Sequence, residues 1–420
     1  MVTAQRRRVV AGILAAILFV TAAPAAEAES RQIITIDAVH SLTRLGAGDW
    51  SAAGLGLVEV DLQSTGNRQA RGRLRVTAEA SADGSTDARI DRAFVKVRLP
   101  LLQERWFHIT AGRARLSWGD GAYFNAADTL YGRVGESGSF VEDTLRDEAS
   151  WILAGFFPLG RFSFIEPVVL VPGVDVLSEA QEPPGIETSA AGLRLQGKLG
   201  QIKAEASYLY DGGVARGGVT GSGPGSGPGE SPGESPGESP GESPGPDGGT
   251  APGDLHRPAV SLQGNLGVDW YLSASTAIPG PYSEAPEGYA EKQLAFSFGL
   301  LHIASYPGGE TLSLRLESLL LPRQRWDVPE AGAPEDGESY ALALFPELIW
   351  SPTRTLSLYL RSLISPIDLS AQVTPGVRWN ALEGVTFYGF ANVLAGEAAD
   401  VYGFARPGGF SFVTGLQFVY

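Results

Sequence analysis

Long runs in which apolar and polar residues alternate recur along this chain, and they constrain its fold more than any other feature. The run 70–82 has one apolar parity, which includes Leu74 and Val76. Its other parity includes Arg73 and Arg75. Most runs are about ten to thirteen residues long, whereas strands of water-soluble proteins usually have about 5 to 6 residues. A tilted strand crosses a lipid bilayer in about 9 to 11 residues, so runs of this kind favour membrane strands.

Eighteen such runs are separated by turn residues, and an even number suits an antiparallel barrel. The connections alternate between brief turns, as at Gly200, and long segments, as at 118–148. We therefore predict an all-β fold, a transmembrane antiparallel up-and-down β-barrel of about 18 strands, with 16 as the alternative count. The expected strands lie near 32–41, 53–64, 70–82, 87–99, 105–117, 149–158, 161–172, 187–199, 201–210, 257–267, 268–279, 291–303, 310–321, 338–351, 354–365, 368–379, 384–396 and 409–420.

The N-terminus has the pattern of a secretory signal peptide. Three arginines, residues 6–8, precede an apolar stretch that is followed by small residues ending at Ala28. We predict a signal peptide at 1–28 and a single barrel domain at 29–420. Removing three arginines and Glu27 would change the net charge from −15 to −17, which disfavours nucleic acid as a partner. The chain has no cysteine, so it can form neither a disulfide nor a thiolate metal site.

The closing strand carries a further signal. The residues that share its apolar parity are Phe410, Phe412, Leu416, Phe418 and Tyr420. This ending resembles the C-terminal strand of bacterial outer-membrane β-barrels, which the barrel-assembly machinery recognises as an insertion signal. The resemblance implies a location in the outer membrane of a diderm bacterium, with the lipid bilayer and that machinery as partners. An edge strand of a soluble β-protein is the alternative that the residues leave open.

The connection 118–148 is the third external loop, counted along the predicted barrel, and it is the candidate constriction. In porins the loop at this position folds into the barrel and narrows the channel, so the resemblance implies the same here. Acidic residues outnumber the two arginines of the segment, Arg133 and Arg146. The candidates for the constriction are Asp120, Asp128, Glu136, Glu142 and Asp143.

Basic residues of the preceding strands form a candidate basic wall. On expected inward parities lie Arg71, Arg73, Arg75, Arg92, Lys96 and Arg98, with Arg113 and Arg115 nearby. An acidic loop opposite a basic wall would create a transverse field, although these arginines could instead only pin the loop through salt bridges. With Ile109 facing lipid, Arg113 and Arg115 would point outward unless a bulge at Gly112 shifts the register.

The segment 112–130 resembles a strand-to-loop motif of porin-like outer-membrane families, including alginate-export-type barrels. Gly-Arg at 112–113, Trp-Gly at 118–119 and Phe-Asn at 124–125 carry the resemblance. It implies the fold and not the substrate. A second long connection, 211–256, contains a Gly-Glu-Ser-Pro repeat without apolar residues, which we expect to be disordered and external.

An enzyme is disfavoured by the residues. The four histidines, His40, His108, His256 and His302, are scattered over different predicted elements without a metal-binding or nucleophile motif, and we expect no cofactor and no metal. The patterns predict a porin-like channel for passive diffusion of small hydrophilic solutes or ions. The alternative is a surface-exposed barrel with an occluded lumen, acting as an adhesin or ligand-binding module. A homo-oligomer is left open.

Overall fold

The computed structural model describes residues 30–44, 50–64, 69–82, 84–100, 106–135, 145–146, 149–171, 189–212, 254–281, 288–323, 341–396, 400, 402 and 409–420. Most of them lie in strands. The strands are β1 (Ser30–Arg44), β2 (Trp50–Ser64), β3 (Ala70–Ser81), β4 (Thr86–Pro100), β5 (Trp106–Ala114), β6 (Ser150–Pro158), β7 (Phe164–Val171), β8 (Ala190–Leu199), β9 (Ile202–Asp211), β10 (Leu255–Asn265), β11 (Asp269–Ser275), β12 (Ile278–Pro279), β13 (Ala295–Ser305), β14 (Thr311–Leu321), β15 (Ala341–Ser351), β16 (Leu356–Ser365), β17 (Ser370–Leu382), β18 (Val385–Ala395) and β19 (Phe410–Val419).

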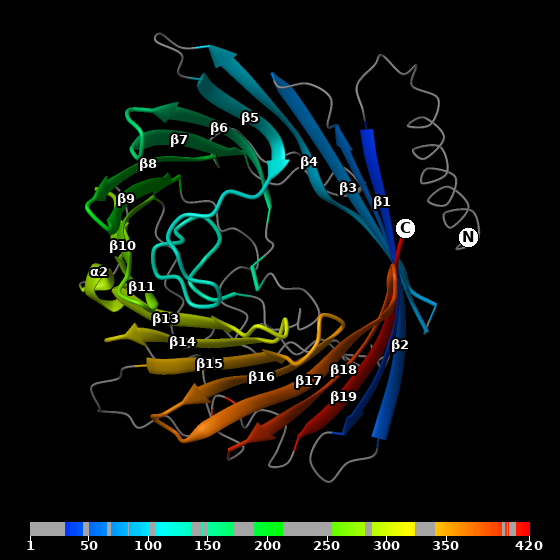
Figure 1. The fold of residues 1–420 in the computed structure, drawn as a ribbon. Helices are drawn as coiled ribbons and strands as arrows, with labels where there is room; N and C mark the ends of the chain where they lie inside the picture. Colours follow the sequence, from blue (N-terminus) through cyan, green and yellow to red (C-terminus); the bar gives the residue numbers. More distant parts are fainter. Residues whose placement is uncertain are drawn as a thin grey trace, which may run out of the picture.

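The strands form one closed ring. Each pairs antiparallel with its neighbours, and β1 pairs with both β2 and β19, so that no edge is left open (Figure 1). β11 and β12 both pair with β10 and make one stave, interrupted at Thr276 and Ala277. The 19 labelled strands therefore form an 18-stranded barrel, which confirms the predicted fold class and strand number.

The two faces of the wall differ as the alternation predicts. On β14 and β15 the inward parity includes Glu317 and Glu347, which are buried. The opposite parity includes Leu314, Leu316 and Leu348, each about two-fifths exposed. In β19 the outward parity carries Phe410, Phe412, Leu416 and Phe418, while Gln417 reaches Asp37 on the inner face of β1.

The connections divide between the two ends of the barrel. At the end that holds the closing residue Tyr420, neighbouring strands are joined by brief turns, such as 200–201 and 383–384. We call this the short-turn end, and the other the long-loop end. The long-loop end carries the connections β5–β6, β7–β8 and β9–β10. The predicted signal peptide and the Gly-Glu-Ser-Pro repeat lie outside the described residues.

Some strand ends differ from the sequence prediction. β13 begins at Ala295 and not at residue 291, because Tyr289–Lys292 form the short helix α2. β7 begins at Phe164, because the N–H of Leu159 donates to the carbonyl of Ser163 and closes a turn there. Within the described part of the chain, no helix is both long and apolar enough to cross a membrane.

Three tyrosines on the inner face lie over glycines of the adjacent strand. The cross-strand pairs are Tyr271 with Gly299, Tyr359 with Gly376, and Tyr388 with Gly415. A Cβ at any of these glycines would overlap the tyrosine ring. Aromatic coverage of a strand glycine restores packing that the missing side chain would provide, and it fixes the register of the two strands.

Adding a methyl group under one of these rings should destabilise the barrel. We expect Gly376→Ala to lower the free energy of unfolding by about 1–3 kcal/mol, because the ring of Tyr359 must leave its place. Urea unfolding of the folded barrel, followed by tryptophan fluorescence, measures this.

Gly389→Ala is the matched control, because a Cβ there would meet Thr414 Cγ2 at an ordinary 3.6 Å. Equal unfolding midpoints for the two variants would show that the tyrosine–glycine contact does not hold the strands.

Candidate functional site

The chain leaves the wall after β5 and enters the ring, where residues 115–135, here called the inserted segment, lie inside the barrel (Figure 1). Trp118 lies near the start of this segment and is fully buried. Its indole N–H donates to Glu166 Oε2 of β7 at 3.2 Å. Gly192 of β8 makes room for the ring, because a Cβ there would lie 2.6 Å from the tryptophan. The segment is thus seated on the inner wall from its first residues.

Glu317 of β14 is the main anchor of the segment. Its side chain is 2% exposed. The backbone N–H groups of Tyr123 and Phe124 donate to Oε2, each at 2.8 Å, and that of Ala122 donates to Oε1 at 3.0 Å. A carboxylate that accepts three N–H groups in a buried place makes charge-assisted bonds of about 1.5–3 kcal/mol each.

Other strands add further acceptors and donors. Glu205 of β9 accepts the N–H of Gly119 at 2.7 Å, and Ser297 of β13 accepts another backbone N–H of the segment at 2.9 Å. The hydroxyl of Tyr271 on β11 donates to the carbonyl of Phe124 at 2.8 Å. These contacts supply partners for backbone groups that have left the sheet ladder.

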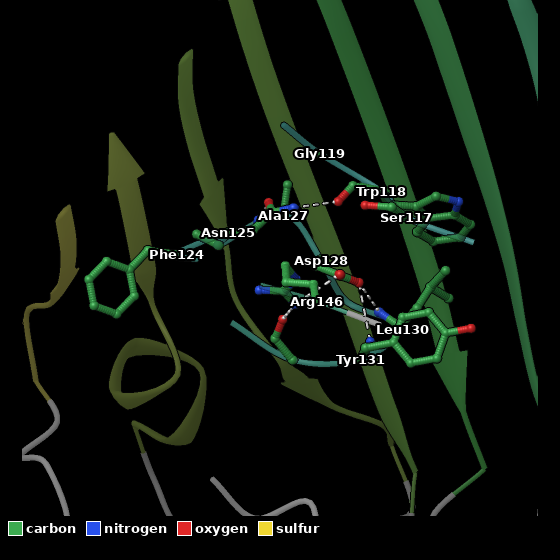
Figure 2. A network of polar contacts seen from close by, with 12 residues as sticks. Ser117, Trp118, Gly119, Phe124, Asn125, Ala127, Asp128, Leu130, Tyr131 and Arg146 are labelled. Atoms are coloured by element: carbon green, nitrogen blue, oxygen red, sulfur yellow. Dashed lines mark hydrogen bonds and ion pairs between the residues drawn. The ribbon is translucent and has the colours of Figure 1, made fainter. Parts of the chain in front are cut away.

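A buried ion pair joins the inserted segment to Arg146, which lies further along the same connection. Asp128 and Arg146 are 2.9 Å apart, and both side chains are 2% exposed. The other carboxylate oxygen of Asp128 accepts the N–H groups of Leu130 and Tyr131 (Figure 2). Arg146 also donates to the carbonyl of Tyr123. Because each charge is compensated and hydrogen-bonded, the pair can persist away from water.

The acidic candidates of the constriction therefore have different surroundings. Asp120 contacts Lys203 of β9 at 2.6 Å, at a partly exposed position, and Ser261 of β10 at 3.3 Å. Asp128 is enclosed and paired, so its charge holds the segment and does not face water. Glu136, Glu142 and Asp143 lie outside the described residues.

Six of the basic-wall candidates share one face of β3 and β4. Register pairs Arg71 with Lys96 and Arg75 with Arg92, and it places Arg73 and Arg98 on the same parity. Arg73 and Arg75 contact Asp61 of β2, at 2.5 and 3.5 Å. Arg71, Lys96 and Arg98 form no ion pair with any residue that the structure describes.

Arg113 lies on the other parity. It pairs with Trp151, whereas Gly112 pairs with Ile152, whose side chain packs against Trp118. The pairing of β5 continues through Gly112 without an inserted residue, although this glycine has φ +120°. The register therefore places Arg113 on the outward parity, because no bulge at Gly112 shifts the pairing. The one irregularity nearby is in β4, opposite Arg75 and Val76. Arg115 follows the end of β5.

Local sequence patterns do not predict the contacts of several residues that hold the inserted segment. Glu317, Glu205 and Tyr271 were recognisable only as strand residues, and Arg146 only as a charge of the loop. Their partners lie between 18 and 195 residues away along the chain, and no local pattern records such a contact. Among the described residues, no group of three or more His, Asp or Glu side chains could hold a metal ion.

The sequence matches no protein-family model, and comparison with curated proteins also gives no match. Solved structures with a similar course include OprB from Pseudomonas putida, with 9% identity, 93% of this chain and 94% of that chain covered, and a TM-score of 0.48. OccD3 from Pseudomonas aeruginosa has 6% identity and a TM-score of 0.47, and the match covers 93% of this chain and 91% of that chain. OmpF from Salmonella typhi, in complex with daunomycin, has 9% identity and a TM-score of 0.45, and the match covers 94% of this chain and 98% of that chain. With TM-scores below 0.5, the functional conclusions below rest on this chain's own residues. The alginate-export-type resemblance stays a prediction.

Loss of the Glu317 carboxylate should release the inserted segment. Because the chain has no cysteine, a single Leu145→Cys at a buried position beside Tyr123 can report this. In the Glu317→Gln background we expect thiol modification by a small methanethiosulfonate reagent to be about tenfold faster, since one charge-assisted bond or more is lost.

The control is Glu383→Gln, which removes an exposed carboxylate from a short turn. Equal modification rates in the two backgrounds would mean that Glu317 does not hold the segment.

Proposed function

We propose that this protein is an outer-membrane channel through which small hydrophilic solutes diffuse passively. The outward parity exposes leucines and phenylalanines around the ring, as a lipid-facing wall requires. The inward parity carries carboxylates, arginines and hydroxyls, which need water or polar partners. Barrels of about 16 to 18 strands are wide enough to enclose an aqueous channel.

The observation that carries this proposal is the attachment of the inserted segment to one side of the inner wall. Its contacts described above run to strands from β7 to β14. A segment held on the inner wall by buried carboxylates narrows a lumen at a fixed place. Solutes would pass between the segment and the wall of β1 to β4, which makes 118–148 a constriction.

The finer proposal concerns the field across this passage. The connection 118–148 carries seven acidic and two basic residues. Arg71, Lys96 and Arg98 stand on the inner face of β3 and β4 without ion partners among the described residues. Opposed charges across a narrow aqueous gap orient permeating ions and dipolar solutes.

Targeting follows from the chain termini. We propose that the signal peptide at 1–28 directs export and that Phe410, Phe412, Leu416, Phe418 and Tyr420 form the insertion signal. Outward tryptophans near strand ends, such as Trp50 and Trp379, are suited to the membrane interface. Assembly into a homo-oligomer is compatible with this proposal.

Reconstitution in planar lipid bilayers tests the channel directly. We expect discrete, stable conductance steps from the purified full chain. A protein that folds, as judged by its β-sheet circular dichroism, but gives no step at any voltage would contradict the channel. Capture of a specific ligand by such a non-conducting barrel would favour the surface module.

Neutralising Asp120 should reduce cation preference, because its charge lies at a partly exposed position and Lys203 would lose its counter-charge. Reversal potentials of Asp120→Asn in a salt gradient measure this, with Glu383→Gln as a control outside the segment. An unchanged reversal potential would mean that Asp120 only pins the segment to β9.

A further inference from the structure

A hollow of about 590 Å³ lies on the inner wall beside the proposed constriction. Phe156 of β6, Phe164 of β7 and Phe162 of the intervening turn line it, and Arg161 and Lys198 stand beside them. We call this the aromatic–cation pocket. Lys203 also lines it and contacts Asp120, so the pocket lies between the inserted segment and the short-turn end.

Phe156 and Phe164 pack against each other and form an apolar surface in the pocket. The ring centroids of Phe156 and Phe164 are 4.5 Å apart, and Phe156 stacks on His108 of β5 at 5.5 Å. Phe162 is 53% exposed. Large apolar rings on the polar inner face of a barrel cost free energy in contact with water, so a solute that covers them gains from burial.

Two cations lie beside these rings. The Arg161 guanidinium and the Lys198 ammonium each lie 5.2 Å from the centroid of Phe162. Neither forms an ion pair with a described residue, whereas Lys203 is paired with Asp120 at 2.6 Å. Asp269, the acidic residue of the lining, accepts a hydrogen bond from Asn265 at 2.6 Å.

The neighbouring strands extend this positive region. Arg71, Lys96 and Arg98 occupy the short-turn ends of β3 and β4, and Arg98 pairs in register with His108, which stacks on Phe156. In a chain with a net charge of −15, five cations that form no ion pair with a described residue lie on one part of the inner wall and mark a local reversal of charge. Such a region attracts anions into the pocket.

We propose that the aromatic–cation pocket binds small aromatic carboxylates. The ring of the solute would stack on the phenylalanines, and its carboxylate would lie between Arg161 and Lys198, where charge-assisted hydrogen bonds can form. A pocket of this volume can hold a solute of one ring. The inference rests on the proposed channel, because it names a solute class for the same lumen.

Titration calorimetry of the full chain in detergent, with benzoate as the probe, tests the pocket without relying on conductance. We expect saturable binding that Arg161→Gln together with Lys198→Gln weakens by about tenfold or more. Phe162→Ala should weaken it as well. Arg354→Gln is the matched control, because this exposed arginine lies in the short turn 352–355, away from the pocket, and should leave the affinity unchanged.

Acetate and galacturonate separate the features that the pocket would recognise. We expect both to bind about tenfold more weakly than benzoate, since they carry the charge without an aromatic ring. Equal affinities for the three anions, or an unchanged benzoate affinity in the double variant, would overturn the proposal. Conductance without benzoate binding would contradict the proposed ligand of the pocket but not the proposed channel. Benzoate binding without conductance would contradict the channel but not the ligand.

Discussion

This architecture depends on one constraint: backbone N–H and C=O groups that are away from water need hydrogen-bond partners. The ring satisfies those of the wall by pairing every strand on both sides, β1 with β19 included. The inserted segment leaves that ladder, so the inner wall must supply acceptors in its place. Glu317, Glu205 and Ser297 do so, from three different strands. The position of the inserted segment is therefore set by acceptors on the inner wall more than by the segment's own sequence.

The fold was predictable because its signals are local. Alternation within a strand such as 70–82 reports which face meets water. From β5 onward, brief turns also alternate with long connections, apart from the brief connection between β16 and β17. The structure confirms all eighteen staves, with ends that shift where another local interaction prevails, as α2 does before β13. Strand ends depend on turns and caps, which period-2 patterns do not record.

The candidate site was predictable only in part. The inward parity of Arg71, Arg73, Arg75, Lys96 and Arg98 follows from alternation and agrees with the observed register. The burial of Asp128 does not, because its partner Arg146 approaches through the tertiary course of the loop. Arg113 shows the same limit, since its side depends on whether Gly112 inserts a bulge, and the sequence alone leaves that open.

The anchor at Glu317 also implies an order of events during folding. Its three partners lie 193 to 195 residues earlier in the chain, and thirteen labelled strands precede β14. Contacts of such sequence separation form late, because the intervening chain must first be brought into place. The inserted segment thus acquires its main anchor only once β14 has joined the wall, so in a barrel stalled before that stage this segment would not be held by Glu317.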